Sequence, residues 1–110
     1  MLELPIYNKL VRDKILEIMD AQGKTYNARV LDSEEYSQEL KKKFQEEVNE
    51  FIEAKTDVES MEELADLLEL IYAALGAQNK TMDELEKVRL QKKEKRGGFE
   101  QRLFLIDGED

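Results

Sequence analysis

The sequence predicts a mainly α-helical protein, and three observations support this fold class. Leu, Glu and Lys are abundant and Pro occurs once in 110 residues, a composition that favours helix. Apolar residues recur at the three- and four-residue spacing of a helix face over much of the chain. The Ser/Thr-x-x-Glu pattern of a helix start occurs at Ser60–Glu63 and at Thr81–Glu84.

These signals predict four helices in one compact domain, residues 1–110, of the four-helix-bundle type. Asp13 is expected to cap the first helix, Ser33 begins the second, and the two capping boxes open the third and fourth. The expected helices cover about residues 13–22, 33–55, 60–78 and 81–96. Gly97-Gly98 marks the end of the last one.

A small two-stranded β ribbon is the one expected departure from helix. Residues 25–31 place Tyr26, Ala28 and Val30 on one face of a short strand. Residues 99–106 alternate apolar and polar side chains imperfectly. The sequence therefore predicts that these two segments pair.

Charge and composition exclude several function classes. The formal net charge of −9 argues against a nucleic-acid polymer as partner, because binding its backbone needs a cationic surface. The chain has no Cys and no His, which excludes disulfides, thiol nucleophiles and imidazole bases. It has neither an apolar run of membrane-spanning length nor the apolar segment of a signal peptide, so no membrane association is expected. We therefore expect a cytoplasmic protein.

Two acid pairs interrupt faces that ought to be buried. On a helical wheel, Glu47 falls inside the apolar stripe of the second helix and Glu50 lies at its edge, whereas Glu46 points further outward. On the third helix, Glu63 and Asp66 lie beside an apolar flank. That helix is apolar over most of its circumference, which predicts a central position.

Two interpretations of these acids remain open. The protein's own Lys and Arg side chains would pair with them, or they would line a solvated groove, and Glu63 would serve only as the capping partner of Ser60. Alternatively they form a site for a hard metal ion, since Mg²⁺ prefers oxygen ligands and four unpaired buried carboxylates would cost too much. A zinc site is not expected without His or Cys.

The fourth helix carries a basic counterpart. Its inward face begins with Met82, Leu85 and Val88 and continues with cations. These cations are Arg89, Lys92, Lys93 and Arg96. Cations favour a helix C-terminus in any protein, but a polyphosphate held between a metal and this face would explain why several share it. Near the N-terminus, Lys9, Arg12 and Lys14 add positive charge and are more often surface residues than ligands.

The residues resemble the all-α nucleotide pyrophosphohydrolases. "EEVNE", followed after Glu50 by twelve residues and then "ELAD", is similar to the E-x-x-E…E-x-x-D pattern of that superfamily. The opening "YNKLVRDKI" and the closing "KRGGF" with its apolar continuation resemble a MazG-like subgroup, the phosphoribosyl-ATP pyrophosphohydrolase-like proteins. Leu16 stands where this subgroup is expected to have Pro, a change that affects only the helix start.

The resemblance implies a site and an assembly. Glu47, Glu50, Glu63 and Asp66 would bind Mg²⁺, with Mn²⁺ as a substitute, and cations near "KKEKRGGF" would contact phosphates. The family fold is a helical bundle that usually forms a homodimer or homotetramer, often with the active site near a subunit interface. The expected substrate is a nucleotide of unspecified base.

The resulting hypothesis is the Mg-dependent hydrolysis of a nucleoside triphosphate, or a related nucleotide, to the monophosphate and pyrophosphate by a metal-activated water. Glu47 or Glu50 would accept the proton of this water. The pyrophosphate would be held by Lys92, Lys93 or Arg96, and Asn8, Lys9 and Arg12 would contact phosphate or sugar. The alternative is a non-catalytic helical module that dimerises and binds a basic partner through its acidic face.

Overall fold

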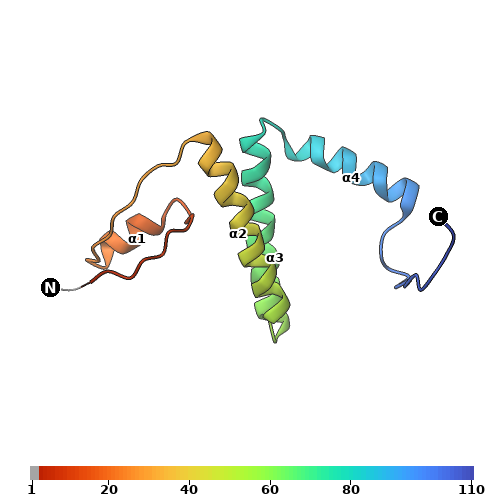
Figure 1. Ribbon diagram of the computed structural model, residues 1–110, viewed down its shortest axis with the longest axis horizontal. Helices are drawn as coiled ribbons and strands as arrows, with labels where there is room; N and C mark the ends of the chain where they lie inside the picture. The colour runs from red at the N-terminus through yellow and green to blue at the C-terminus, as the bar shows by residue number, and fades with distance from the viewer. Residues whose placement is uncertain (1–2) are drawn as a thin grey trace.

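The computed structural model describes residues 3–110 and confirms the all-α class. Its helices are α1 (Ile15–Ala21), α2 (Ser33–Glu53), α3 (Asp57–Ala77) and α4 (Met82–Arg96). The long helices α2 and α3 form a hairpin, and Figure 1 places it at the centre of the molecule. Within residues 3–110, this is the only pair of helices with extensive contact.

The N-terminal caps explain where the long helices begin. The side chain of Asp32 accepts a hydrogen bond from the backbone N–H of Glu35 at 2.8 Å, so α2 begins at Ser33 as predicted. Thr56 accepts from the N–H of Glu59 at 3.1 Å and starts α3 at Asp57. The predicted capping box Ser60–Glu63 is therefore wrong. Thr56–Glu59 has the same Thr-x-x-Glu spacing and starts the helix one turn earlier.

The two outer helices confirm one predicted start and correct another. Thr81 and Glu84 form the predicted capping box of α4, and Gly97, with φ of 80°, follows its last residue. Asp13 does not cap α1. The cap position is Lys14, and no side-chain hydrogen bond closes this end in the described structure.

The predicted β ribbon is wrong, because no strand forms anywhere between residues 3 and 110. Arg102 has a φ of 57°, outside the extended region, and its backbone N–H donates to the carbonyl of Phe99 at 3.1 Å, which makes a turn. The two segments also lie on opposite sides of the hairpin. Residues 25–31 accompany α1, whereas residues 99–106 follow α4 (Figure 1). Neither segment has the other within reach of a hydrogen-bond ladder.

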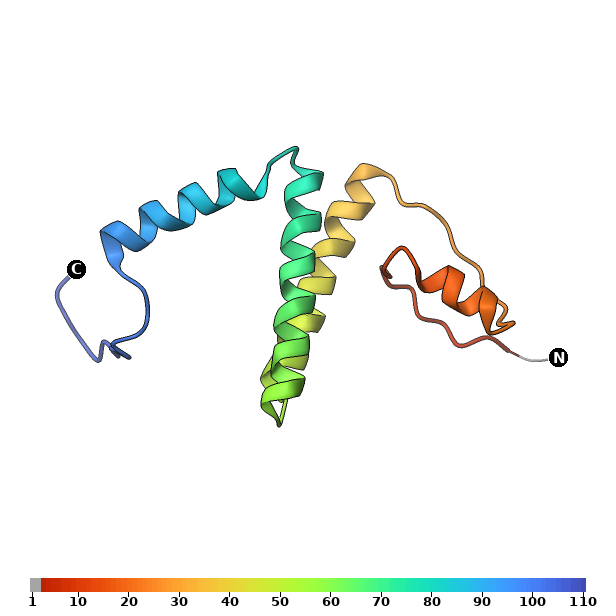
Figure 2. The same ribbon diagram turned by 180° about the vertical axis from the view of Figure 1, so that it is seen from behind.

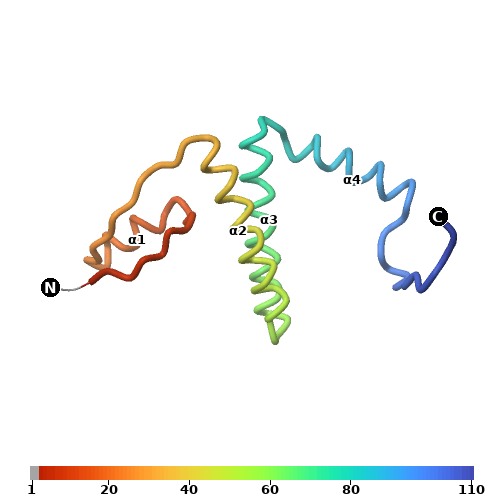
Figure 3. The backbone as a smooth tube through the Cα atoms, in the orientation of Figure 1, coloured from red at the N-terminus to blue at the C-terminus, as the bar shows by residue number. Residues whose placement is uncertain are grey.

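The chain is open rather than closed into a bundle on its own. Figure 2 shows α1 and α4 extending away from opposite sides of the hairpin, and the tube in Figure 3 shows the segments before and after α1 running beside that helix. The radius of gyration is 18.8 Å, whereas a compact chain of this length has about 13 Å. Leu40, 4% exposed, is the only buried hydrophobic residue in the part of the chain that is described.

The solvent-accessible surface area also shows that the chain is open. It amounts to 10603 Å², against about 6,300 Å² for a compact monomer of this mass. Many large apolar side chains are among the exposed residues. On α3 the exposed side chains include Met61, Leu64, Leu68 and Tyr72, which we call the outer stripe of α3. The prediction that α3 is central therefore holds on one side only, where α3 packs against α2.

Candidate metal centre

Glu47 is the one buried charged residue among residues 3–110, with 7% of its surface exposed. It belongs to α2 and projects toward Glu63 and Asp66 of α3. On the helical wheel, Glu47 lies inside the apolar stripe of α2 that includes Leu40. The prediction of an inward-facing acid is thus confirmed. Burying a carboxylate is costly unless a cation or a proton accompanies it.

The four predicted carboxylates gather around Glu47 in two overlapping groups. Glu47, Glu63 and Asp66 each offer an oxygen, and these oxygens all lie within 4.8 Å of one another. Glu46, Glu47 and Glu50 do the same. The first group joins α2 to α3, and the second lies on one turn of α2. Such carboxylate groups on facing helices can hold a divalent metal ion.

The crowding of acids changes their protonation. Burial raises the pKa of Glu47 to about 8, and its neighbours Glu63, Glu50 and Asp66 add to the rise. The pKa of Glu63 is raised as well. The interaction with Glu47 by itself lowers it, but burial and the charges of Glu50 and Asp66 outweigh that effect. Without a cation, the centre therefore retains a proton near neutral pH.

Within the described residues, the protein's own cations pair with some of these carboxylates but leave two of their oxygens without a partner. Lys43 lies 3.3 Å from Glu46 Oε1 and 3.9 Å from Glu47 Oε1. The Nη2 atom of Arg12 donates to Asp66 Oδ1 at 2.5 Å. The Oε2 atoms of Glu47 and Glu63 are buried and have no hydrogen-bond partner within residues 3–110. Two orphaned carboxylate oxygens, one on each helix, fit the oxygen-rich ligand set that Mg²⁺ and Mn²⁺ prefer.

The predicted phosphate-binding cations form a separate cluster. Lys92, Lys93 and Arg96 line a hollow at the end of α4, which Arg89 and the Gly97–Glu100 segment complete. Because α4 extends away from the hairpin, this basic hollow does not face the carboxylates of the same chain (Figures 1 and 2). The structure brings together the four acids but not the acids and these bases.

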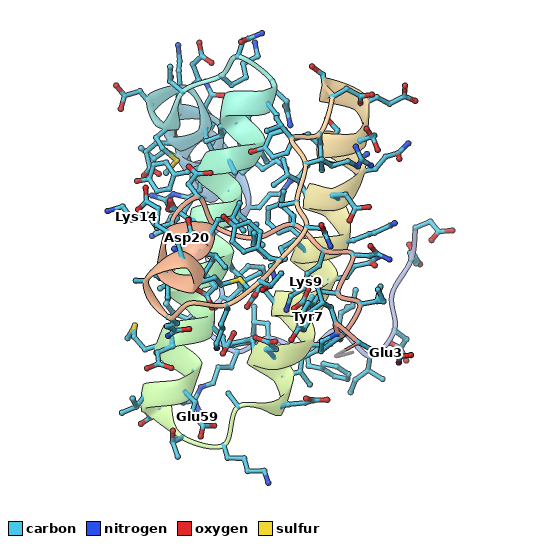
Figure 4. The ribbon with its side chains drawn as sticks, turned by 90° about the vertical axis from the view of Figure 1, so that its left-hand side faces the viewer. Glu3, Tyr7, Lys9, Lys14, Asp20 and Glu59 are labelled. Carbon is cyan, nitrogen blue, oxygen red and sulfur yellow. The ribbon has the colours of Figure 1, made fainter. Side chains whose placement is uncertain are left out.

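The N-terminal segment is closer to the acids than the basic hollow is. Of the predicted substrate-binding residues, Arg12 reaches Asp66. Asn8 has a positive φ of 45°, in the left-handed region. The ammonium group of Lys9 lies over the ring of Tyr7, 5.6 Å from its centre, and Figure 4 shows these two side chains together.

The sequence interpretation missed two residues of the centre. Glu46 was expected to point outward, but it joins Glu47 and Glu50 in the second group. Lys43 was not considered, although its spacing of four residues from Glu47 places both on one helix face. The pair Arg12–Asp66 spans 54 residues, so no local sequence signal could have revealed it.

Comparison with known proteins places the chain in a family. Residues 8–93 match the family described as phosphoribosyl-ATP pyrophosphohydrolase. The chain belongs to the phosphoribosyl-ATP pyrophosphohydrolase family. The match covers all four helices except the last turn of α4, and it includes every carboxylate of the metal centre. No curated protein and no solved structure matches the chain.

Family membership supports the broad class of activity. A phosphoribosyl-ATP pyrophosphohydrolase is a hydrolase, and the acidic centre lies within the matched residues. This agrees with the MazG-like resemblance of the opening motif and of the two acid pairs, whereas "KRGGF" at residues 95–99 lies outside the matched residues. Among residues 3–110, none of the helices has both the length and the apolar character needed to cross a bilayer.

Proposed function

We propose that this protein hydrolyses a nucleoside triphosphate, or a related nucleotide, to the monophosphate and pyrophosphate, with Mg²⁺ as cofactor. The observation that carries the proposal is the pair of buried, unpartnered oxygens on Glu47 and Glu63, in a family of pyrophosphohydrolases. A buried structural acid normally finds a hydrogen-bond partner. Two such oxygens, on side chains whose carboxylate groups come within 4.8 Å of each other, therefore favour a bound cation.

Four carboxylates would hold the metal: Glu47, Glu50, Glu63 and Asp66, with Mn²⁺ as a substitute. When bound, the ion would offset the charge of the polyphosphate and make a nearby water more acidic. Glu47 or Glu50 would accept the proton of that water, since a carboxylate within hydrogen-bond reach of a metal-acidified water can act as its general base. Arg12, Asn8 and Lys9 would contact phosphate or sugar from the N-terminal segment, and of these Arg12 reaches the acids.

A homo-oligomer would cover the exposed apolar face and bring basic residues to the acidic centre. The exposed surface exceeds that of a compact monomer by about 4,000 Å², well above the roughly 800 Å² that one partner contributes to a standard interface. The outer stripe of α3 is the apolar face that a second copy would cover. In a homodimer or homotetramer, α4 of one chain would pack on another hairpin, so Lys92, Lys93 and Arg96 would meet the phosphates there.

Glu63→Gln tests the function. The substitution keeps the size of the side chain and removes one ligand charge, so we expect pyrophosphate release and Mn²⁺ affinity to fall at least tenfold together. The matched control is Glu62→Gln, which removes the same charge from an exposed neighbour on α3 and should leave both unchanged. If Glu63→Gln retains both properties at wild-type level, the site assignment is refuted.

A binding measurement separates the enzyme from the non-catalytic acidic module. Mg²⁺ or Mn²⁺ with a non-hydrolysable nucleotide should raise the Tm of the wild-type protein through mass action. Each such ligand at one hundred times its Kd stabilises a protein by about 2.7 kcal/mol. A docking face for a basic protein would show no response to either ligand.

A further inference from the structure

One hydrogen bond connects the N-terminal segment to the metal centre. Arg12, in the turn before α1, donates to Asp66 of α3 at 2.5 Å. Every other side-chain hydrogen bond within the described residues joins positions no more than six apart. Figure 1 shows this turn on the side of α1 that faces the hairpin. Within the described residues, the bond from Arg12 to Asp66 is therefore the one side-chain hydrogen bond that joins the N-terminal segment to α3.

Asp66 is at the same time a member of the carboxylate group with Glu47 and Glu63. A divalent ion held by that group would draw on the same carboxylate that accepts from Arg12. The ion pair is exposed, with 59% of the Arg12 side chain and 37% of the Asp66 side chain accessible, so it contributes little to the stability of the fold. Arg12 and a metal ion thus compete for Asp66. The metal ion would bind more tightly, because it can also bind oxygens of Glu47 and Glu63.

We propose that Arg12 is a resident counter-ion of the metal centre that exchanges places with the metal. Its guanidinium holds Asp66 until a divalent ion binds, and it then turns to the anionic phosphate group of the substrate. The inference rests on the metal site proposed above. It adds a direction of coupling: metal binding breaks the hydrogen bond between Arg12 and Asp66, and substrate binding gives Arg12 a new anionic partner.

The chemistry of arginine suits this exchange. Its planar guanidinium forms two parallel hydrogen bonds with a carboxylate or with a phosphate, so the same side chain serves both partners. It remains charged at every relevant pH, so its partner is chosen by electrostatics rather than by protonation. After the exchange, the guanidinium of Arg12 would lie beside the metal centre and could pair with the negative charge of an incoming polyphosphate.

The test is the metal affinity of Arg12→Ala without nucleotide, measured by Mn²⁺ titration calorimetry on the full chain. Removing the competing cation should tighten Mn²⁺ binding about 1.4- to 5-fold, the range that corresponds to an exposed ion pair. The matched control is Arg29→Ala. Arg29 pairs with Glu35 at 2.6 Å with similar exposure, 67% and 39%, and this pair includes no acid of the metal centre. The control removes the same charge and should leave the affinity unchanged.

A second readout follows Arg12 itself. The side-chain Nε–H resonance of Arg12, assigned by its loss in Arg12→Ala, should shift on addition of Mg²⁺ with the midpoint of metal binding. With Mg²⁺ present, a non-hydrolysable triphosphate should shift it again. Arg12→Lys keeps the charge but loses the fork of donors, so we expect metal affinity near wild type and weaker binding of this nucleotide.

The outcomes separate the exchange from the metal site. If the wild-type protein shows no Mn²⁺ binding that depends on Glu63, the metal site fails and the exchange fails with it. If Mn²⁺ binds in a Glu63-dependent manner but Arg12→Ala binds it equally well or more weakly, the exchange alone is overturned. The exchange would also be overturned if the Nε–H resonance of Arg12 did not shift on addition of Mg²⁺.

Discussion

Glu47→Gln gives the sharpest test of the buried acid, through the pH dependence of stability. The folded protein raises the pKa of Glu47 from 4.5 to about 8, chiefly by burial. In the unfolded chain the carboxyl ionises near 4.5, whereas in the folded chain it keeps its proton up to about pH 8. The stability that the protonated acid supports is therefore complete below pH 4.5 and is lost as the pH rises to about 8.

The magnitude follows from the same pKa values. A rise from 4.5 to about 8 corresponds to about 5 kcal/mol at a pH above both values, which is a ceiling because four acids share the effect. Glutamine stays neutral at every pH, and its amide could donate to the unpartnered oxygen of Glu63. We expect Glu47→Gln to stabilise the metal-free protein at pH 9 by at least about 2 kcal/mol, or roughly 8–16 °C in Tm.

The assay is thermal unfolding in chelator between pH 4 and pH 9. The Tm of the wild type should fall relative to that of Glu47→Gln as the pH rises, and the two should converge below pH 4.5. Added Mg²⁺ should stabilise only the wild type at pH 8 and narrow or reverse the difference. Glu53→Gln, which removes an exposed acid from the end of the same helix, is the control and should follow the wild type. Parallel curves for wild type and Glu47→Gln in chelator would refute the reasoning.

Two further predictions concern the fold and the assembly. Thr56→Ala should lower the free energy of unfolding by about 1 kcal/mol because it removes the cap of α3. Ser60→Ala should change it by less than about 0.5 kcal/mol. Urea unfolding of both variants checks this, and equal losses would contradict the observed start of α3. Leu68→Glu, in the outer stripe of α3, should shift the protein toward a monomer in sedimentation and reduce pyrophosphate release, whereas Glu69→Gln, at an exposed position beside it, should do neither. A Leu68→Glu protein with the wild-type sedimentation coefficient would exclude this face as the interface.

The sequence determined the helices and the inward position of Glu47. Periodic apolar residues and local capping patterns act over three or four positions, so the capping box at Thr81–Glu84 and the start of α2 could be predicted from neighbours alone. The same local reasoning chose Ser60 over Thr56 because the two patterns are equivalent at short range.

Only the tertiary structure decided how the helices and loops meet. It separated residues 25–31 from residues 99–106 and so removed the expected ribbon, and it added Glu46 to the acids. It also brought Arg12 to Asp66 across 54 residues and left the cations of α4 away from the acids of their own chain. Such long-range contacts depend on where the hairpin and its flanking segments pack, which no local pattern encodes.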